Sequence, residues 1–394
     1  MYDQLDFQDP SAPLIRSRLP VTILTGFLGS GKSTFLNSLF KDPNFQKILV
    51  IVNEFGEIGL DHLLIERPEE NIVLLEGGCL CCEVRGDLVQ TLSDIHERRS
   101  GGSLAEFDRI IVETTGLSNP VPIIQSILCD INLTPHYEFG KVITIVDSRE
   151  IESQVEKYVE AIQQVAVADV LLVSKMDIPD HSSMENLEAI LRPINPGSPM
   201  IDLQDNSNQL SMSDFLHAGA RAENEAFMRW LDKGEDFILA NQNASLQDTS
   251  ERVALHPIKS HGISLFSESK RVHTFSLRRE GAITGNSFVI WLNLLATMKG
   301  ENILRLKAIL NIEGKPIALH GTHTIIHEPI EITKWPSADH ASRFVVITNG
   351  PLQKQFERSL ELLDFNVQHH EKVELIDPES YQKFLKLAES FSHI

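Results

Sequence analysis

The segment GFLGSGKS at residues 26–33 constrains the fold more than any other feature, because it matches the pattern G-x-x-x-x-G-K-[ST]. An apolar run precedes it, and a helical pattern begins at Lys32. Glycines let the backbone curl so that several N–H groups point at one phosphate, and the following helix N-terminus adds its positive dipole. The segment therefore predicts a nucleotide-phosphate loop. Its predicted contacts are Gly26, Phe27, Leu28, Gly29, Ser30, Gly31, Lys32, Ser33 and Thr34.

Within this loop, two side chains have predicted roles. Lys32 would bridge the β- and γ-phosphates, and the Ser33 hydroxyl would bind Mg²⁺.

Short apolar runs alternate with amphipathic stretches as far as about residue 205. The runs are rich in Val, Ile and Leu, as expected of parallel strands that are buried on both faces. Such alternation predicts an α/β P-loop NTPase fold, a mainly parallel sheet flanked by helices. The predicted strands are residues 21–25, 47–53, 72–75, 109–112, 142–146 and 170–173, and the predicted helices are 32–40, 88–99, 122–129, 153–166 and 213–231.

The chain divides into four predicted parts. Residues 1–19 form a flexible tail, 20–232 the P-loop domain, 233–269 a polar linker and 270–394 a smaller α+β domain. In the last part the predicted strands are 273–277, 304–310 and 344–348, and the predicted helices are 288–298, 356–363 and 380–391.

Charge and apolar content exclude several classes of protein. The formal net charge of the 394-residue chain is −20, which disfavours nucleic-acid and anionic-membrane partners. No apolar run approaches the roughly 18 residues of a membrane span, and no signal peptide opens the chain. We therefore expect a cytoplasmic protein in a reducing compartment.

A second phosphate-side element follows the strand predicted at 109–112. Glu113 stands at the strand tip, where a carboxylate can hold the magnesium shell or orient water. Three residues later, the Gly116 N–H can approach the γ-phosphate. Glu113 is therefore a predicted catalytic and magnesium residue, and Gly116 a predicted nucleotide contact.

The strand predicted at 170–173 leads into the segment Ser-Lys-Met-Asp. The carboxylate of Asp177 can accept from both N1–H and N2–H of guanine, whereas adenine would leave it desolvated and unpaired. The stem of Lys175 would cover the base. Ser174 stands where this pattern usually has Asn, and its shorter side chain can make fewer bonds, so we expect somewhat relaxed base selectivity.

Three of the four cysteines, Cys79, Cys81 and Cys82, fall within four positions. They suit a loop that wraps a soft ion, since thiolates bind Zn²⁺ or Cu⁺ well and three leave a fourth position open. Glu57, a water or a client side chain is the candidate fourth ligand. A redox-active pair and buried inert thiols stay open as alternatives. Cys129 lies in a helical pattern and is predicted to be a core residue.

Together these residues resemble the CobW-type GTPases, relatives of the nickel-insertion GTPases for urease and hydrogenase. The likeness covers about residues 20–200 and 270–365, where the C-terminal part carries RLKAILNIEGKPIALHG at 305–321. The hallmark motifs are GFLGSGKST at 26–34, NEFGEIGLD at 53–61, EGGCLCCEVRGDL at 76–88, ETTGLSNP at 113–120 and SKMD at 174–177.

The resemblance implies GTP hydrolysis coupled to delivery of a metal, Zn²⁺ first and Co²⁺ second, to a client metalloprotein. It adds Glu57 to Lys32 and Glu113 as a predicted catalytic residue, and a nucleotide-dependent homodimer as a further partner. It also implies nucleotide contacts just after the cysteines, at Cys82, Glu83, Val84, Arg85 and Gly86.

Two departures from the family pattern bear on the metal and the client. The His-rich run of many zinc-handling relatives is missing, and the nearest approach to a cluster, His320, His323 and His327, is interpreted as structural or surface. The N-terminal tail lacks a Cys-containing docking motif, so no client is indicated.

Two other kinds of function compete with the GTPase metallochaperone. One is a P-loop small-molecule kinase or ATPase with structural or redox cysteines, although no acceptor-site base or arginine-rich lid is evident. The other is a non-enzymatic metal buffer, which would leave Lys32, Ser33 and Asp177 without a purpose.

Overall fold

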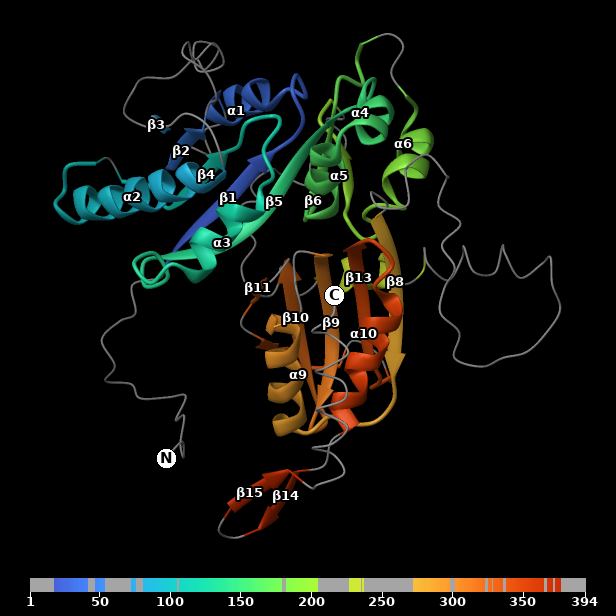
Figure 1. Cartoon of the computed structure of the whole chain (residues 1–394). Coiled ribbons are helices and arrows are strands. Elements are labelled where there is room, and N and C mark those ends of the chain that lie inside the picture. The colour runs from blue at the N-terminus through green and yellow to red at the C-terminus, as the bar shows by residue number, and fades with distance from the viewer. Residues whose placement is uncertain are drawn as a thin grey trace.

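The computed structural model describes residues 18–41, 47–53, 72–75, 81–104, 106–178, 182–204, 227–234, 236, 272–297, 302–322, 325–327, 329–335, 338–364, 367–370 and 373–376. These residues form two large sheets and a two-stranded ribbon (Figure 1). None of the helices in the described part of the chain is both long and apolar enough to cross a membrane.

The N-terminal sheet has seven parallel strands in the order β3-β2-β4-β1-β5-β6-β7, which confirms the predicted α/β fold. Six strands overlap the predicted ones, whereas the three-residue β7 is too short for an apolar run to reveal. Their bounds are β1 Leu19–Thr25, β2 Ile48–Asn53, β3 Ile72–Leu75, β4 Arg109–Glu113, β5 Tyr137–Asp147, β6 Val170–Ser174 and β7 Met200–Asp202.

Helices cover both faces of this sheet. On β1, Leu24 packs with α1, and its neighbour Ile23 packs with α2 and α3, because successive side chains of a strand point to opposite faces. The helices are α1 Lys32–Lys41, α2 Cys81–Ser100, α3 Val121–Cys129, α4 Ile151–Lys157, α5 Val159–Ala166 and α6 Met184–Leu191.

Three helix predictions need correction or remain partly open. The single helix expected at 153–166 is two helices, because Tyr158 is extended (φ −122°, ψ 122°) and packs its ring 4.7 Å from that of Phe27. Helix α2 starts seven residues earlier than expected, and the segment 81–87 contains no proline that would prevent it. Residues 227–234 are helical, and the rest of the helix predicted at 213–231 lies outside the described residues.

The C-terminal sheet is antiparallel, with the order β11-β10-β9-β13-β8 and β12 paired to β10. Helices α9 and α10 pack on one face of it (Figure 1), which confirms the predicted α+β unit. The helix expected at 380–391 lies outside the described residues. The elements are β8 Val272–Arg279, α9 Gly285–Thr297, β9 Ile303–Ile312, β10 Lys315–Thr322, β11 Ile325–Ile326, β12 Ile330–Glu331, β13 Ser342–Asn349, α10 Gln353–Leu360, the 3₁₀ turn η6 Glu361–Asp364, β14 Val367–His370 and β15 Val373–Ile376.

The other face of the C-terminal sheet packs against the N-terminal unit. One hydrophobic cluster joins Val165 of α5 and Leu171 of β6 to Ile309 of β9 and Val345 of β13. The two units therefore share a core. The predicted boundaries at 1–19, 20–232, 233–269 and 270–394 stay predictions.

Candidate functional site

The phosphate loop joins β1 to α1 through glycines with positive φ angles, +146° at Gly26, +72° at Gly29 and +99° at Gly31. Residues with a side chain rarely adopt such angles. At Gly26 the space is also missing, because a Cβ would lie 2.4 Å from the carbonyl oxygen of Ile145 in β5. The loop can therefore take this tight shape only with glycine at that position.

Lys32, the first residue of α1, is buried and its side chain turns back over the loop. Its Nζ donates to the carbonyl oxygens of Gly26 at 3.0 Å and Phe27 at 3.4 Å. The Ser30 N–H closes the loop by donating to the Phe27 oxygen at 3.1 Å. The ammonium is thus held above the turn, where the motif requires a cation for the phosphates.

The segment after β4 lies directly against the phosphate loop. Glu113 is 4% exposed, and the next N–H, that of Thr114, donates to the Leu24 carbonyl oxygen at 2.9 Å. Two residues further, the backbones approach so closely that a Cβ on Gly116 would lie 2.5 Å from the Leu28 nitrogen. The fold therefore brings both predicted residues of this segment beside the phosphate loop.

The residues present fit a magnesium ion. Ser33 lies in the first turn of α1, which follows β1, and Glu113 ends the neighbouring strand β4. A hydroxyl and a carboxylate are oxygen donors of the kind Mg²⁺ takes from protein beside phosphate oxygens. When bound, the ion would neutralise charge on the phosphates.

The predicted base-reading segment follows β6 at the same edge of the sheet. Ser174 Oγ donates to the carbonyl oxygens of Ser30 at 2.7 Å and Val146 at 3.2 Å, so this hydroxyl ties the segment to the phosphate loop. Lys175 adopts a left-handed conformation with φ +62°. The following Asp177 is exposed in a turn. Its carboxylate is thus open to a ligand.

Part of the predicted site lies outside the described residues, namely Glu57 and Cys79. Helix α2 begins at Cys81, so the prediction that all three cysteines lie in a loop is wrong for Cys81 and Cys82. The thiolate ligands and their alternatives stay predictions. Among the described residues, no group of three or more metal-binding side chains is assembled. The backbone of the first turns of α2 also includes Cys82, Glu83, Val84, Arg85 and Gly86.

The core assignment of Cys129 is wrong. Its side chain is exposed at the last position of α3. The buried face of that helix runs through Ile123, Ile124 and Ile127, and the side chain at position 129 is not part of that face.

Two buried polar residues next to the site were not predicted. Asp147, at the end of β5, accepts a hydrogen bond from Lys175 Nζ at 2.5 Å. Its position directly after the strand predicted at 142–146 was a sequence signal that could have revealed it. Gln164 of α5 donates through Nε2 to the carbonyl oxygens of Gly116 at 3.1 Å and Ser118 at 3.0 Å. Nothing local in the sequence marks this glutamine.

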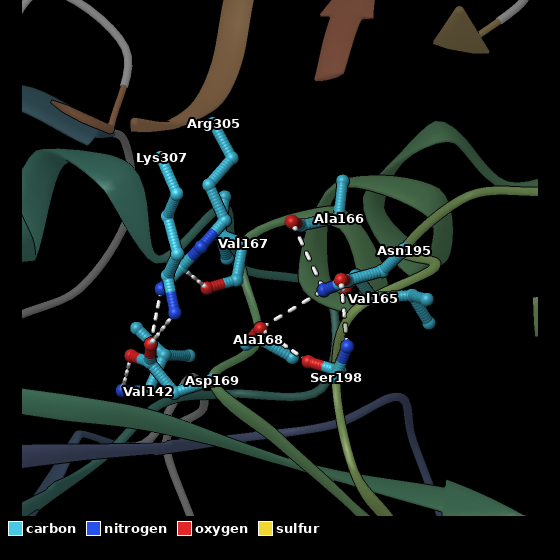
Figure 2. A network of polar contacts seen from close by, with 10 residues as sticks. All are labelled: Val142, Val165, Ala166, Val167, Ala168, Asp169, Asn195, Ser198, Arg305 and Lys307. Atoms are coloured by element: carbon cyan, nitrogen blue, oxygen red, sulfur yellow. Dashed lines mark hydrogen bonds and ion pairs between the residues drawn. The ribbon is translucent and has the colours of Figure 1, made fainter. Parts of the chain in front are cut away.

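A cluster of buried charges joins the two units (Figure 2). From β9, Arg305 donates to the Val167 carbonyl oxygen and to Asp169, and Lys307 Nζ lies 3.4 Å from the same carboxylate. Burial lowers the pKa of Lys307 to about 7, an effect that Arg305 reinforces and Asp169 opposes. Although burial alone would raise the pKa of Asp169, the two cations and the Val142 N–H hold it well below its usual range.

Two of the three scattered histidines pack beside this cluster, as their structural interpretation expects. The His320 ring lies 4.4 Å from Phe227, and the His327 ring lies 5.3 Å from Phe139. Burial, with Arg305, lowers the pKa of His327 to about 4. His323 lies outside the described residues.

Two family models match the chain. The nucleotide-binding domain of the CobW/HypB/UreG family matches residues 20–202, and the C-terminal domain of the cobalamin synthesis protein CobW matches residues 272–363. Both halves of the described structure are therefore covered by models of one family.

Curated relatives have chaperone and GTPase names. The zinc chaperone YjiA of Escherichia coli K12 is 36% identical over 182 residues, 46% of this chain and 56% of that protein. The zinc-regulated GTPase metalloprotein activator 1 of Schizosaccharomyces pombe is 28% identical over 272 residues, 66% of this chain and 62% of that protein. The matches thus span little more than half of each relative.

A solved structure supports the fold. The Zn(II)-bound YjiA GTPase from Escherichia coli aligns with a TM-score of 0.57 at 20% identity and covers 88% of this chain and 99% of that one. With a phosphate loop built as its motif requires, and both family domains in order, the chain belongs to the CobW family.

Proposed function

We propose that this protein is a GTPase that binds a transition metal through Cys79, Cys81 and Cys82 and delivers it to a client metalloprotein under control of the nucleotide. Zinc is the first candidate metal and cobalt the second. The names of the relatives, a zinc chaperone and a zinc-regulated GTPase metalloprotein activator, support this class of activity.

One observation carries the proposal: the cysteine segment and the phosphate loop leave the sheet at the same edge. Cys79 and Cys81 follow β3, and the phosphate loop follows β1, in a sheet whose order is β3-β2-β4-β1. In a parallel sheet the carboxyl ends of all strands lie on one edge, and three strand spacings amount to about 14 Å. The metal ligands proposed after β3 would therefore lie about three strand spacings from the phosphate loop, a distance that a few residues can span.

The base side supports guanine as the preferred base. Asp177 is exposed, and the bond from Ser174 to Ser30 places its turn next to the phosphate loop. A carboxylate there can accept both donors of guanine, which adenine lacks.

The catalytic assignments follow the charges near the phosphates. Lys32 would stabilise negative charge that grows on the γ-phosphate, and Glu113 would hold the magnesium shell or orient the attacking water. Glu57 is proposed as a further catalytic residue on the family resemblance alone. A nucleotide-dependent homodimer is proposed on the same ground.

Steady-state hydrolysis of GTP and ATP by the full chain, with and without Zn²⁺, tests the enzymatic part. We expect GTP to be hydrolysed in preference to ATP. A preference for ATP, or phosphate transfer to a small acceptor, would favour the kinase or ATPase instead. Absence of any hydrolysis would leave a metal buffer.

Competition titration of Zn²⁺ and Co²⁺ in the presence of Mg²⁺ tests the switch. With a non-hydrolysable GTP analogue we expect metal to bind roughly 5–150-fold more tightly than with GDP, a coupling of about 1–3 kcal/mol, and the effect must be reciprocal. The triple variant Cys79→Ser, Cys81→Ser, Cys82→Ser should bind nucleotide and lose the coupling. Equal metal affinity in both nucleotide states would refute the switch.

A further inference from the structure

The segment after β4 is held from behind by one side chain of α5. Gln164 is 1% exposed and spans two carbonyl oxygens of that segment, those of Gly116 and Ser118, with the two hydrogens of Nε2. A third bond within the segment joins the Thr115 and Ser118 hydroxyls. Since the front of the segment touches Leu28 of the phosphate loop, its position is set from both sides.

Helix α5 is in turn fixed at its C-terminal end. The Gln164 carbonyl oxygen accepts from Thr144 Oγ1 of β5 at 2.8 Å, so the backbone at this position is tied to the sheet. At the helix end, Asn195 Nδ2 donates to the carbonyl oxygens of Val165 at 2.9 Å and Ala168 at 2.9 Å (Figure 2). Little freedom remains for the glutamine unless one of these anchors is lost.

The last anchor of α5 comes from the C-terminal domain. Arg305 donates to the Val167 carbonyl oxygen, which ends the helix, and pairs with Asp169 just beyond it. Positive charge at a helix C-terminus is favourable because the final carbonyl oxygens carry the negative end of the helix dipole. Val167 lies three residues after Gln164, less than one helical turn away. A shift of the helix end therefore moves the glutamine.

From this arrangement we propose that Gln164 is a positioning residue for hydrolysis, and that the C-terminal domain keeps it in place through Arg305. The glutamine sets the position of Gly116 against the phosphate loop, and the C-terminal domain stabilises the helix that carries the glutamine. The inference rests on the proposed GTPase activity. It gives the C-terminal domain a defined effect on the phosphate side of the site.

The first test replaces Gln164 by Met, which keeps the length of the side chain and removes both N–H donors. We expect kcat for GTP to fall about 10- to 100-fold, since small misplacements at a reacting centre have effects of that size. GDP lacks the γ-phosphate that Gly116 would meet, so its affinity should stay within about twofold, while affinity for a non-hydrolysable GTP analogue falls. Gln154→Met on α4 is the matched control, because no hydrogen bond joins that side chain to residues 114–118 in the described structure.

A conservative variant separates positioning from packing. In Gln164→Glu the ionised carboxylate has no hydrogen to donate to the two carbonyl oxygens, whereas its protonated form can donate one. Burial raises the pKa of a carboxyl group, so kcat of this variant should recover relative to the parent as the pH falls from 8 to 6. Gln154→Glu should show no such recovery.

The second test addresses the domain contact. Arg305→Met should lower kcat about 3- to 10-fold, with GDP affinity unchanged, and it should add little to Gln164→Met, because both changes release the same helix end. Thr274→Val is the control for this contact. It removes another hydrogen bond between the domains, from Thr274 Oγ1 to the Pro193 carbonyl oxygen at 3.1 Å, which does not involve α5.

The outcomes separate cleanly. Equal kcat for Gln164→Met and Gln154→Met overturns the positioning role. Parental kcat in Arg305→Met, or full additivity of the two changes, overturns the role of the C-terminal domain. Absence of hydrolysis by the parent chain refutes the proposed function, and the ratio of analogue to GDP affinity in Gln164→Met then decides the positioning role alone.

Discussion

The charge cluster between the domains gives a prediction that distinguishes its two kinds of member. Arg305 and Lys307 are each about 4% exposed, yet they share the single carboxylate of Asp169. The cluster therefore holds one more positive charge than negative while Lys307 is protonated. The carboxylate should stabilise the fold strongly, and the lysine should not.

Asp169→Asn leaves Arg305 buried without its carboxylate, and it removes the negative charge that opposes the lowering of the Lys307 pKa. Removing one partner of a buried pair destabilises proteins by about 3–5 kcal/mol, and we expect a loss of that size at pH 7. Lys307→Met keeps the one-to-one pair of Arg305 and Asp169, and its thioether can pack on Trp230, over whose ring the Lys307 ammonium lies at 4.6 Å. This change should be neutral or stabilising by about 1–2 kcal/mol.

Urea unfolding of the full chain measures both effects, compared at equal m-values. The pH dependence gives a second check. The folded pKa of Lys307 is about 7, below the unfolded value of roughly 10.4, so the parent gains stability as pH rises from 7 to 10. Lys307→Met lacks this gain. The charge reasoning is refuted if both variants lose similar stability, or if the difference in unfolding free energy between Lys307→Met and the parent does not change with pH.

Four further predictions concern the site and the interface. Lys32→Ala should lower kcat for GTP by about 10²-fold or more, because it removes the cation that meets the phosphates; parental turnover would contradict this. Asp177→Asn should weaken GTP and favour xanthosine triphosphate, whose C2 carbonyl accepts from an amide, as competition binding would show. Gly116→Ala should displace its segment from Leu28 and lower the free energy of unfolding by about 1–3 kcal/mol in denaturation. Expressed as an activation free energy, the loss of GTP turnover should be at least as large. The folded pKa of His327, about 4, lies below the unfolded value of roughly 6.5, so stability should fall as the pH drops from 6.5 to 4. His327→Gln should reduce the dependence of the unfolding free energy on pH by the equivalent of about one bound proton, and urea midpoints at pH 5 and 7 measure this.

Local sequence was enough for much of the N-terminal domain. The glycines at 26–33 need positive φ, and six strands coincide with apolar runs of the sequence, so both the phosphate loop and the α/β class follow from short-range rules. Because parallel strands end at one edge, the motifs after β1, β4 and β6 could be expected to converge there, as they do.

Helix limits were less accessible, because they depend on contacts distant in sequence. The break at Tyr158 reflects packing on Phe27, and the exposure of Cys129 reflects where the buried face of α3 ends. No local periodicity contains the contact of Tyr158 with Phe27, whereas the helical spacing of Ile123, Ile124 and Ile127 could have shown that position 129 points away from the buried face.

The sequence by itself determined which chemical groups are available at the carboxyl edge of the parallel sheet, namely the glycines, Lys32, Glu113 and Asp177. Each of them lies in a motif that is recognised by its spacing. Only the tertiary structure decided how that edge connects to the rest of the molecule. In the sequence Gln164 and Arg305 are ordinary polar residues of a helix and a strand. Only the packing of the folded chain brings Gln164 to the Gly116 carbonyl oxygen and Arg305 to that of Val167. The physical reason is that a buried hydrogen bond or charge is defined by its partner, and here the partners lie 48 and 138 residues away.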